Sequence, residues 1–238
     1  MKLKDKVALI TGGATGIGKS IALTYAKEGA VVLIASRNES ALSKAAEEIR
    51  KYSQADYIVC DVSQIDDVTT LSRFVKDKYG RLDVLVNNAS ILGERQSIVN
   101  SSIDVWKSVI DININGTFYV TKSLLPLMIE SHARAIINIS SGVGREGRKE
   151  WGAYSVSKFG VEAFTQILSQ ELDPHHICVN SVNPGRTRTK MRAEAYPNEN
   201  PMTLPKPDGI MDVFLYLVDD QSNNITGSSF DAQGFQRT

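Results

Sequence analysis

Short apolar runs rich in β-branched residues alternate along this chain with longer segments in which apolar residues recur at helical spacing. This alternation is typical of a parallel sheet built from strand–helix–strand units. We predict helices in most of the intervening segments, and strands near residues 6–11, 31–35, 56–60, 83–87, 134–140, 176–182 and 228–231.

The predicted strands are apolar throughout rather than alternately apolar and polar, which indicates a sheet buried on both faces. Parallel strands need right-handed crossovers, so the helices must cover both sides of the sheet. We therefore expect an α/β fold, a doubly wound three-layer sandwich around a seven-stranded parallel sheet. No linker or internal repeat divides the chain, so residues 1–238 are expected to form a single domain.

Residues 196–207 depart from this pattern, because they contain four prolines. Proline resists regular helix, so we expect an irregular segment beside the strand that ends near residue 182. A long irregular segment at a strand end predicts a substrate lid, here at about residues 190–207. A plain connecting loop is the alternative interpretation.

The composition, with 42% hydrophobic and 23% charged residues, is that of an ordinary globular protein. A formal net charge of zero provides no overall basic field to attract nucleic acid or an anionic membrane. The longest apolar run is far shorter than the ~20 residues that span a bilayer. The amino-terminal apolar run is too short for a signal peptide, so we expect a cytoplasmic protein.

The cysteines and histidines do not form a metal-binding pattern. Cys60 and Cys178 lie far apart without C-x-x-C spacing, and we expect both to be buried thiols. His132, His175 and His176 fall near predicted helix ends, where capping or exposure to solvent is the common role. We predict no metal site.

A glycine-rich turn, Thr11-Gly-Gly-Ala-Thr-Gly-Ile-Gly18, follows the first predicted strand and opens a helix. Glycines permit a tight turn and let the backbone approach a pyrophosphate, whose charge faces the helix amino terminus. The strand before and the helix after supply the context that this motif requires. The sequence therefore predicts a dinucleotide site formed by Gly12, Thr15, Gly16, Ile17 and Gly18.

The end of the second strand bears on the choice of cofactor. An NAD enzyme carries an acidic residue there to hold the ribose, but this chain has Ser36, Arg37 and Asn38. Arg37 could pair with a 2′-phosphate, which favours NADP(H) over NAD(H). The alternative is a solvated arginine at the start of a helix, and the glycine turn adds no second basic residue.

Polar residues also end the third and fourth strands. Asp61 could accept a hydrogen bond from an adenine amino group or cap the next helix, for which Ser63 is the more obvious cap. Asn87 and Asn88 could lie along the cofactor, although Asn87 is at least as well suited to bracing the sheet.

Tyr154 and Lys158 are spaced four residues apart in a segment, 152–172, that we expect to be helical. This spacing places the phenol and the ammonium on one helix face, one turn apart. A neighbouring cation favours phenolate, so we expect a lowered Tyr154 pKa. A packed ring beside a solvated amine is the alternative, but Ser140 and Ser141 end a predicted strand 13 residues upstream of Tyr154, where ligands of open α/β sheets bind.

Together these features resemble the short-chain dehydrogenase/reductase family over nearly the whole chain. The resemblance rests on the glycine turn, Asn87-Asn-Ala89, Asn113-Ile-Asn-Gly116, Ser141, Tyr154 to Lys158, and Pro184-Gly185 with Thr189. Within the family, the chain is most similar to a poorly characterised bacterial oxidoreductase subgroup. The resemblance implies a Rossmann-type fold and a homo-oligomer, either dimer or tetramer.

The resemblance also implies the roles of individual residues. Tyr154 would be the general acid in carbonyl reduction and the base in alcohol oxidation, and Ser141 would hold the substrate oxygen. Lys158 would bind the nicotinamide ribose, and Asn113, rather than Asn115, would hold a water that links Lys158 to solvent. Further cofactor contacts are expected from Asp61, Val62, Asn88, Tyr154, Pro184, Gly185, Thr187 and Thr189.

The expected function is hydride transfer between NADP(H) and a carbonyl or secondary alcohol of a small molecule. One alternative function is the reduction of a 3-oxoacyl-(acyl-carrier-protein). A second alternative is that the protein binds the dinucleotide without catalysis and acts as a redox sensor. Seven cations near the predicted site could draw an anionic or carrier-bound substrate, or could simply pair with nearby glutamates. They are Arg145, Arg148, Lys149, Arg186, Arg188, Lys190 and Arg192.

Overall fold

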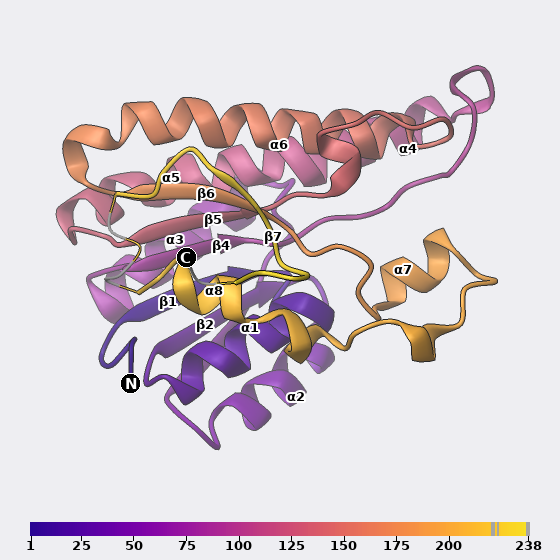
Figure 1. The fold of residues 1–238 in the computed structure, drawn as a ribbon. Coiled ribbons are helices and arrows are strands. Elements are labelled where there is room, and N and C mark those ends of the chain that lie inside the picture. Colours follow the sequence, from indigo (N-terminus) through magenta and orange to yellow (C-terminus); the bar gives the residue numbers. More distant parts are fainter. Residues whose placement is uncertain (220–221, 223, 237–238) are drawn as a thin grey trace.

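The protein forms one parallel β-sheet enclosed between two layers of helices in a computed structural model that describes residues 1–219, 222 and 224–236 (Figure 1). Within the described residues seven strands run parallel in the order β3-β2-β1-β4-β5-β6-β7, which confirms the predicted fold class. The strands are β1 (Val7–Thr11), β2 (Val31–Ser36), β3 (Ala55–Val59), β4 (Val84–Asn87), β5 (Ala135–Ile139), β6 (Cys178–Asn183) and β7 (Ser229–Asp231).

Helices fill the connections between the strands. They are α1 (Gly16–Lys27), α2 (Glu39–Ile49), α3 (Ile65–Tyr79), α4 (Ile103–Ile110), α5 (Gly116–Glu130), α6 (Gly152–Glu171), α7 (Lys190–Ala195) and α8 (Asp212–Tyr216). Short turns of 3₁₀ helix occur at Ile98–Asn100, Gly142–Gly144, Asp173–His175, Pro201–Thr203 and Pro207–Ile210, and one π-helical turn spans Asp111–Asn115.

Alternate residues of each strand supply two separate cores. Ile10 of β1 and Ile34 of β2 pack with α1, α2 and α8, whereas Leu9 and Leu33 pack with α3, α5 and α6 on the opposite face. Figure 1 shows the same division, with α1, α2 and α8 on one side of the sheet and α5 and α6 on the other. Strands buried on both faces must be apolar at every position, which is why the runs do not alternate.

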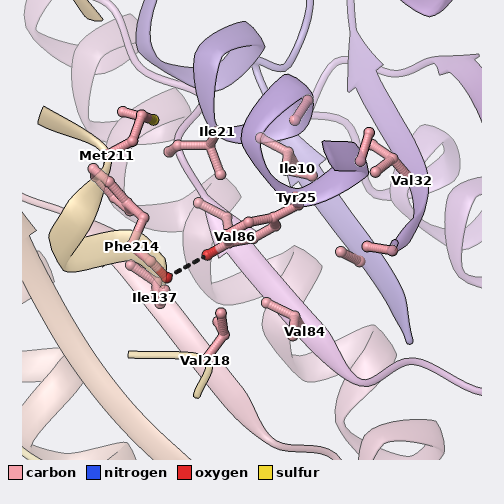
Figure 2. Packing of buried hydrophobic residues seen from close by; sticks show 14 of the residues in the cluster. Ile10, Ile21, Tyr25, Val32, Val84, Val86, Ile137, Met211, Phe214 and Val218 are labelled. Carbon is pink, nitrogen blue, oxygen red and sulfur yellow. Dashed lines mark hydrogen bonds between the residues drawn. The ribbon is translucent and has the colours of Figure 1, made fainter. Parts of the chain in front are cut away.

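The first core includes one buried polar contact. The Tyr25 hydroxyl on α1 donates to the backbone carbonyl of Phe214 on α8 at 3.1 Å, and both rings are fully buried (Figure 2). This bond satisfies a hydroxyl whose burial would otherwise destabilise the fold. It fixes α8, near the end of the chain, against the first helix.

The thiols of Cys60 and Cys178 are buried and free, as expected. Within the described part of the chain, no helix is long and apolar enough to cross a membrane. In that same part, no three histidine, cysteine or acidic side chains are grouped closely enough to hold a metal ion.

Candidate functional site

The carboxyl ends of the central strands meet the glycine turn between β1 and α1. Gly12 has φ of +63°, and a Cβ there would lie 2.7 Å from the Nδ2 of Asn88, while a Cβ on Gly18 would overlap the Gly12 carbonyl oxygen. Thr15 occupies the N-cap position of α1, but no side chain caps the helix. The turn is therefore a cradle shaped for close approach of an anion to the amino terminus of α1.

A first cavity lies on one side of this turn, and its lining includes Gly12, Ser36, Arg37, Asp61 and Val62. The Ser36 Oγ is a buried polar atom without a hydrogen-bond partner among the described residues. An Nη1 of Arg37 lies 3.8 Å from Oδ2 of Asp61, and the Arg37 side chain is 60% exposed. A hydroxyl and a guanidinium are thus available to an anionic group at the end of β2.

Asp61 does not cap the following helix. Its Oδ1 accepts hydrogen bonds from the backbone N–H and the hydroxyl of Ser63, at 3.0 and 2.7 Å. The N-cap residue of α3 is Gln64, and it makes no side-chain capping bond. The capping interpretation is therefore wrong for both Asp61 and Ser63, which stabilise the turn before the helix instead.

The two asparagines that end β4 have different structural roles. The buried Asn87 amide donates to Thr121 Oγ1 and to Asn138 Oδ1, each at 2.9 Å, so Asn87 braces the sheet against α5. The Asn88 amide donates to the backbone carbonyls of Thr11 and Gly12, at 2.9 and 3.1 Å. Asn88 therefore holds the glycine turn in shape.

A second cavity brings together residues that the sequence places far apart. Ser141 follows β5, Tyr154 lies in the first turn of α6, and both line this cavity. It is also lined by the other predicted contacts Ile17, Pro184, Gly185, Thr187 and Thr189. The cavity thus extends from the glycine turn to the segment that follows β6.

Lys158 lies behind the Tyr154 ring, one helical turn further along α6. Its Nζ is 5.7 Å from the centre of that ring and donates to the Ile139 carbonyl at 2.7 Å. The Lys158 side chain is only 2% exposed, and burial lowers its pKa to about 8, while the Glu162 carboxylate acts in the opposite direction. The amine therefore titrates close to neutral pH.

The Tyr154 phenol is not acidified as the sequence suggested. Burial raises the pKa of Tyr154 to about 12, and a hydrogen bond with Ser141 opposes this rise only in part. The expectation of a lowered pKa was wrong because it counted the neighbouring ammonium but not the loss of water around the ring. The phenol is consequently a stable proton donor at neutral pH.

Asn113 lies in the π-helical turn between α4 and α5, directly after Ile112, which lines the first cavity. Its amide oxygen accepts from Ile91 N–H at 2.8 Å, and its Nδ2 donates to the Ile91 carbonyl and to Ser157 Oγ, at 2.9 and 3.0 Å. Asn113 therefore joins the loop after β4 to α6, next to Lys158. Asparagine can disturb the hydrogen-bond pattern of an α-helix, and the pattern is indeed altered here, because residues 111–115 form a π-helical turn.

Arg95, which sequence reasoning missed, packs on two aromatic rings beside the second cavity. The Arg95 guanidinium lies 4.9 and 4.8 Å from the ring centres of Trp151 and Tyr196, which are themselves 6.0 Å apart. Trp151 in turn lies 5.7 Å from the Tyr154 ring. Arg95 is an ordinary loop arginine in the sequence, so only the folded structure shows that it supports the site.

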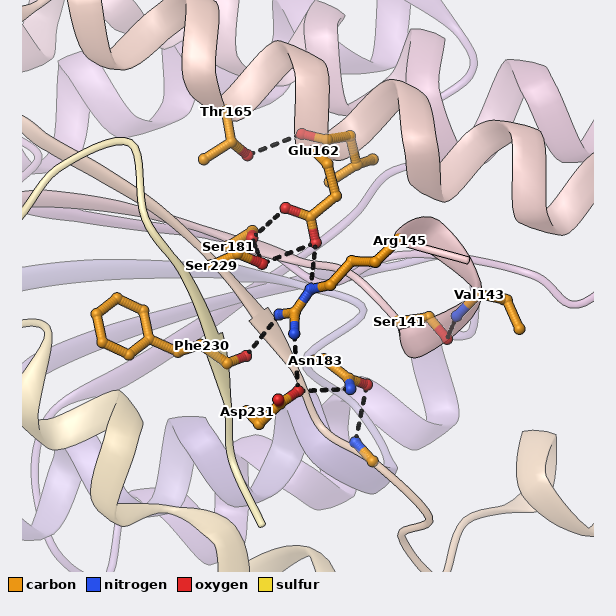
Figure 3. A network of polar contacts seen from close by, with 12 residues as sticks. Ser141, Val143, Arg145, Glu162, Thr165, Ser181, Asn183, Ser229, Phe230 and Asp231 are labelled. Carbon is orange, nitrogen blue, oxygen red and sulfur yellow. Dashed lines mark hydrogen bonds and ion pairs between the residues drawn. The ribbon is translucent and has the colours of Figure 1, made fainter. Parts of the chain in front are cut away.

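The turn that carries Ser141 is anchored through Arg145 (Figure 3). The Arg145 guanidinium lies 3.0 Å from Asp231 Oδ1 and 3.4 Å from Glu162 Oε1. Serine hydroxyls of β6 and β7 also donate to the Glu162 carboxylate. This network, hereafter the Arg145 network, ties the Ser141 turn to α6 and β7.

Comparison with known proteins finds relatives over nearly the whole chain. The family model for short chain dehydrogenases matches residues 6–200. The uncharacterized oxidoreductase YciK of Escherichia coli (strain K12) is 40% identical over 235 residues, which cover 97% of this chain and 93% of YciK. The 3-oxoacyl-(acyl-carrier-protein) reductase FabG of Thermotoga maritima is 37% identical over 246 residues, covering 98% of each protein.

A solved structure is similar over the same extent. A short chain dehydrogenase from Shigella flexneri complexed with NADP has a TM-score of 0.94 and 40% identity, and the match covers 98% of each chain. The structural similarity therefore extends over nearly the whole chain.

Proposed function

We propose, from the premise that this chain belongs to the short-chain dehydrogenase/reductase family, that it is an NADP-dependent oxidoreductase acting on a carbonyl or secondary alcohol. The observation that carries the proposal is the convergence of Ser141 and Tyr154 on one cavity with the buried Lys158 behind the phenol. These groups can hold and protonate an oxygen atom.

The two cavities on either side of the glycine turn fit a dinucleotide. Gly12, Gly16 and Gly18, with Thr15 and Ile17, would hold the pyrophosphate at the start of α1. Asp61 and Val62 would contact the adenosine, with Asn88 supporting the turn, and Pro184, Gly185, Thr187 and Thr189 would lie along the nicotinamide end. When bound, the reduced nicotinamide supplies the hydride.

The protein groups supply the proton in carbonyl reduction. Ser141 hydrogen-bonds the carbonyl oxygen, and Tyr154 transfers its hydroxyl proton to that oxygen as negative charge develops there. The O–H bond of Tyr154 breaks, and the resulting phenolate is stabilised by the Lys158 ammonium. Lys158 would then pass a proton to the Tyr154 phenolate, and Asn113 would position a water that returns a proton from solvent to Lys158.

Tyr154→Phe tests the assignment. We expect turnover to fall by ~10²-fold or more, because the variant keeps the ring but loses the proton donor. NADPH affinity should be nearly unchanged, and Tyr52→Phe, at an exposed tyrosine, should leave both quantities unchanged. Undiminished turnover in Tyr154→Phe would remove this residue from the mechanism.

The preference for NADP is supported by Arg37 and the unpartnered Ser36 hydroxyl at the end of β2, and by the NADP in the Shigella structure. We predict that Arg37→Ala weakens NADPH binding at least ~10-fold more than NADH binding, since only NADPH carries the 2′-phosphate. Arg73→Ala, on the exposed surface of α3, is the matched control. Equal weakening of both cofactors, measured by fluorescence titration, would refute this role.

A second candidate function is reduction of a 3-oxoacyl-(acyl-carrier-protein), supported by the similarity to the Thermotoga enzyme. A panel of carbonyl substrates followed at the reduced-nicotinamide absorbance separates the candidates. Activity with an acetoacetyl thioester and none with simple ketones would favour this second function. A non-catalytic redox sensor is disfavoured by the presence of all three groups, Ser141, Tyr154 and Lys158.

Two structural roles complete the proposal. Residues 190–207 would act as a lid, supported by the packing of Met191, Ala195 and Tyr196 against Trp151 and Tyr154. The chain would also assemble with copies of itself through α5 and α6, which present several exposed apolar side chains.

A further inference from the structure

We propose that the catalytic crevice selects small carbonyl compounds that carry an anionic group, a carboxylate or a phosphate, which Arg148 and Arg186 bind beside Ser141. This inference rests on the proposed reductase function and adds the class of its substrate. It depends on the different contacts that the seven cations near the site make.

Three of these cations already bind carboxylates or backbone carbonyls of the protein itself. The Arg145 guanidinium is held in the Arg145 network by Glu162 and Asp231. Arg188 donates to the backbone carbonyl of Leu204 at 3.1 Å. Arg192 forms a two-bond pair with Glu199, at 2.6 and 2.7 Å, and so its charge is already neutralised.

Two further cations face solvent. The Lys190 side chain is 93% exposed and lies 3.8 Å from Glu194 on the same helix. Lys149 is exposed, and it does not line either cavity beside Ser141. Neither residue is placed to touch a molecule whose carbonyl lies at Ser141.

Arg148 and Arg186 remain, and both line a third cavity that opens beside the second one. Ser141, Trp151 and Arg192 line both of these cavities, so the two are continuous. No aspartate or glutamate is among the described residues that line the third cavity. An anionic group there would lie next to a carbonyl held at Ser141.

The positive charges of Arg148 and Arg186 are available to bind an anionic ligand. Arg148 lies 3.9 Å from Glu146, but both side chains are more than half exposed, and such a pair is weak. Arg186 makes no ion pair with any described residue. The pKa of the nearby Glu199 is lowered mainly by its hydrogen bonds with Arg192, and the Arg186 charge adds only a smaller effect. Planar guanidinium groups bind carboxylates and phosphates through two parallel hydrogen bonds.

The test uses two matched pairs of probes: 4-oxopentanoate with its methyl ester, and dihydroxyacetone phosphate with dihydroxyacetone. We expect kcat/KM to favour the charged member of at least one pair by ~10-fold or more, and the preference to shrink at high salt. The pair that shows the preference distinguishes a carboxylate substrate from a phosphate substrate.

Arg148→Gln and Arg186→Gln should each reduce this preference several-fold, mainly through KM of the charged probe. Lys190→Gln is the control and should retain the preference. An equal rate for both members of each pair, in the unsubstituted protein, would overturn the anion site and leave the reductase function standing.

Binding to the NADPH-loaded protein, followed by quenching of NADPH fluorescence, separates the two proposals. Charged probes that bind without being reduced, and lose affinity in the arginine variants, would support the anion site and contradict the reductase function. A strong preference for an acetoacetyl thioester of an acyl carrier protein, unaffected by Arg148→Gln and Arg186→Gln, would overturn the inference. The inference would also be overturned if no probe bound to the protein and none was reduced.

Discussion

Lys158 has an unusual setting for an ammonium group, because it is almost fully buried and donates a hydrogen bond to a backbone carbonyl. Burial favours its neutral form, and the carboxylate of Glu162, one turn further along α6, favours its charged form. The charge state of Lys158 at neutral pH therefore depends on a residue that does not line the crevice.

Glu162→Gln tests this dependence. In the reduction direction we expect activity to fall as pH rises through about 8, where Lys158 loses its proton. Without the Glu162 charge the lysine pKa should fall further, so the alkaline limb of kcat/KM should move to lower pH by about one unit. Glu171→Gln, at the exposed end of α6, is the matched control, and an unmoved limb would show that Glu162 has only a structural role.

The sequence could predict that Ser141, Tyr154 and Lys158 lie at the crevice, but it could not predict their electrostatics. The spacing of Tyr154 and Lys158 places both on one helix face in any α-helix. The depth of that face in the protein depends on the packing of Trp151, Leu92 and Ala195 from three separate segments. For this reason the rise of the phenol pKa on burial could not be predicted from the spacing of Tyr154 and Lys158.

At the scale of elements, α7 is held over the crevice by contacts from a distant loop. Arg95 stacks on Trp151 and Tyr196, and its Nη1 donates to the Ala195 carbonyl at the end of α7. The segment after α7 contains only short 3₁₀ turns, as its prolines predicted. Arg95 therefore supplies much of what keeps the proposed lid in position.

Arg95→Leu should loosen this segment. Loss of two cation–π contacts, worth ~1 to 2 kcal/mol together, should raise the substrate KM several-fold and speed proteolysis within residues 190–207. Arg50→Leu removes an arginine bond to the Ala55 carbonyl at the other edge of the sheet, and should change neither measurement. Unchanged proteolysis in Arg95→Leu would contradict the role of Arg95 as a support for the lid.

The positions of the strands and the proline segment were predictable because each follows from local composition. The stack on α7 was not, because Arg95, Trp151 and Tyr196 come from loops whose paths depend on the whole fold. Similarly, the sequence showed a cluster of cations but not which of them line one cavity with their charges unpaired by the fold, and only the folded chain separates Arg148 and Arg186 from the rest.

For the whole molecule, the outer surface of α5 and α6 is unusually apolar. Phe118, Val156, Phe159 and Ile167 are all exposed, and the Phe118 ring packs edge-on against Phe164, so that the two helices form one surface. Exposed apolar patches on otherwise polar proteins commonly mark association sites. This supports the proposed homo-oligomer.

Phe159→Asp should reduce the assembled mass measured by light scattering, because it places a charge within that surface. Tyr52→Asp, a comparable change at an exposed ring after α2, should leave the mass unchanged. A single-chain mass for the unsubstituted protein at micromolar concentration would contradict assembly through these helices.

The contact between the Ser141 turn and α6 has a mechanical consequence. A Cβ on Gly144 would lie 2.8 Å from the backbone of Lys158, so the turn and the helix touch without any intervening side chain. The Arg145 network joins the same two elements a little further along. The serine hydroxyl and the phenol therefore sit on two elements in direct contact, so an opening of the proposed lid would leave the two proton-transfer groups in place for an incoming molecule.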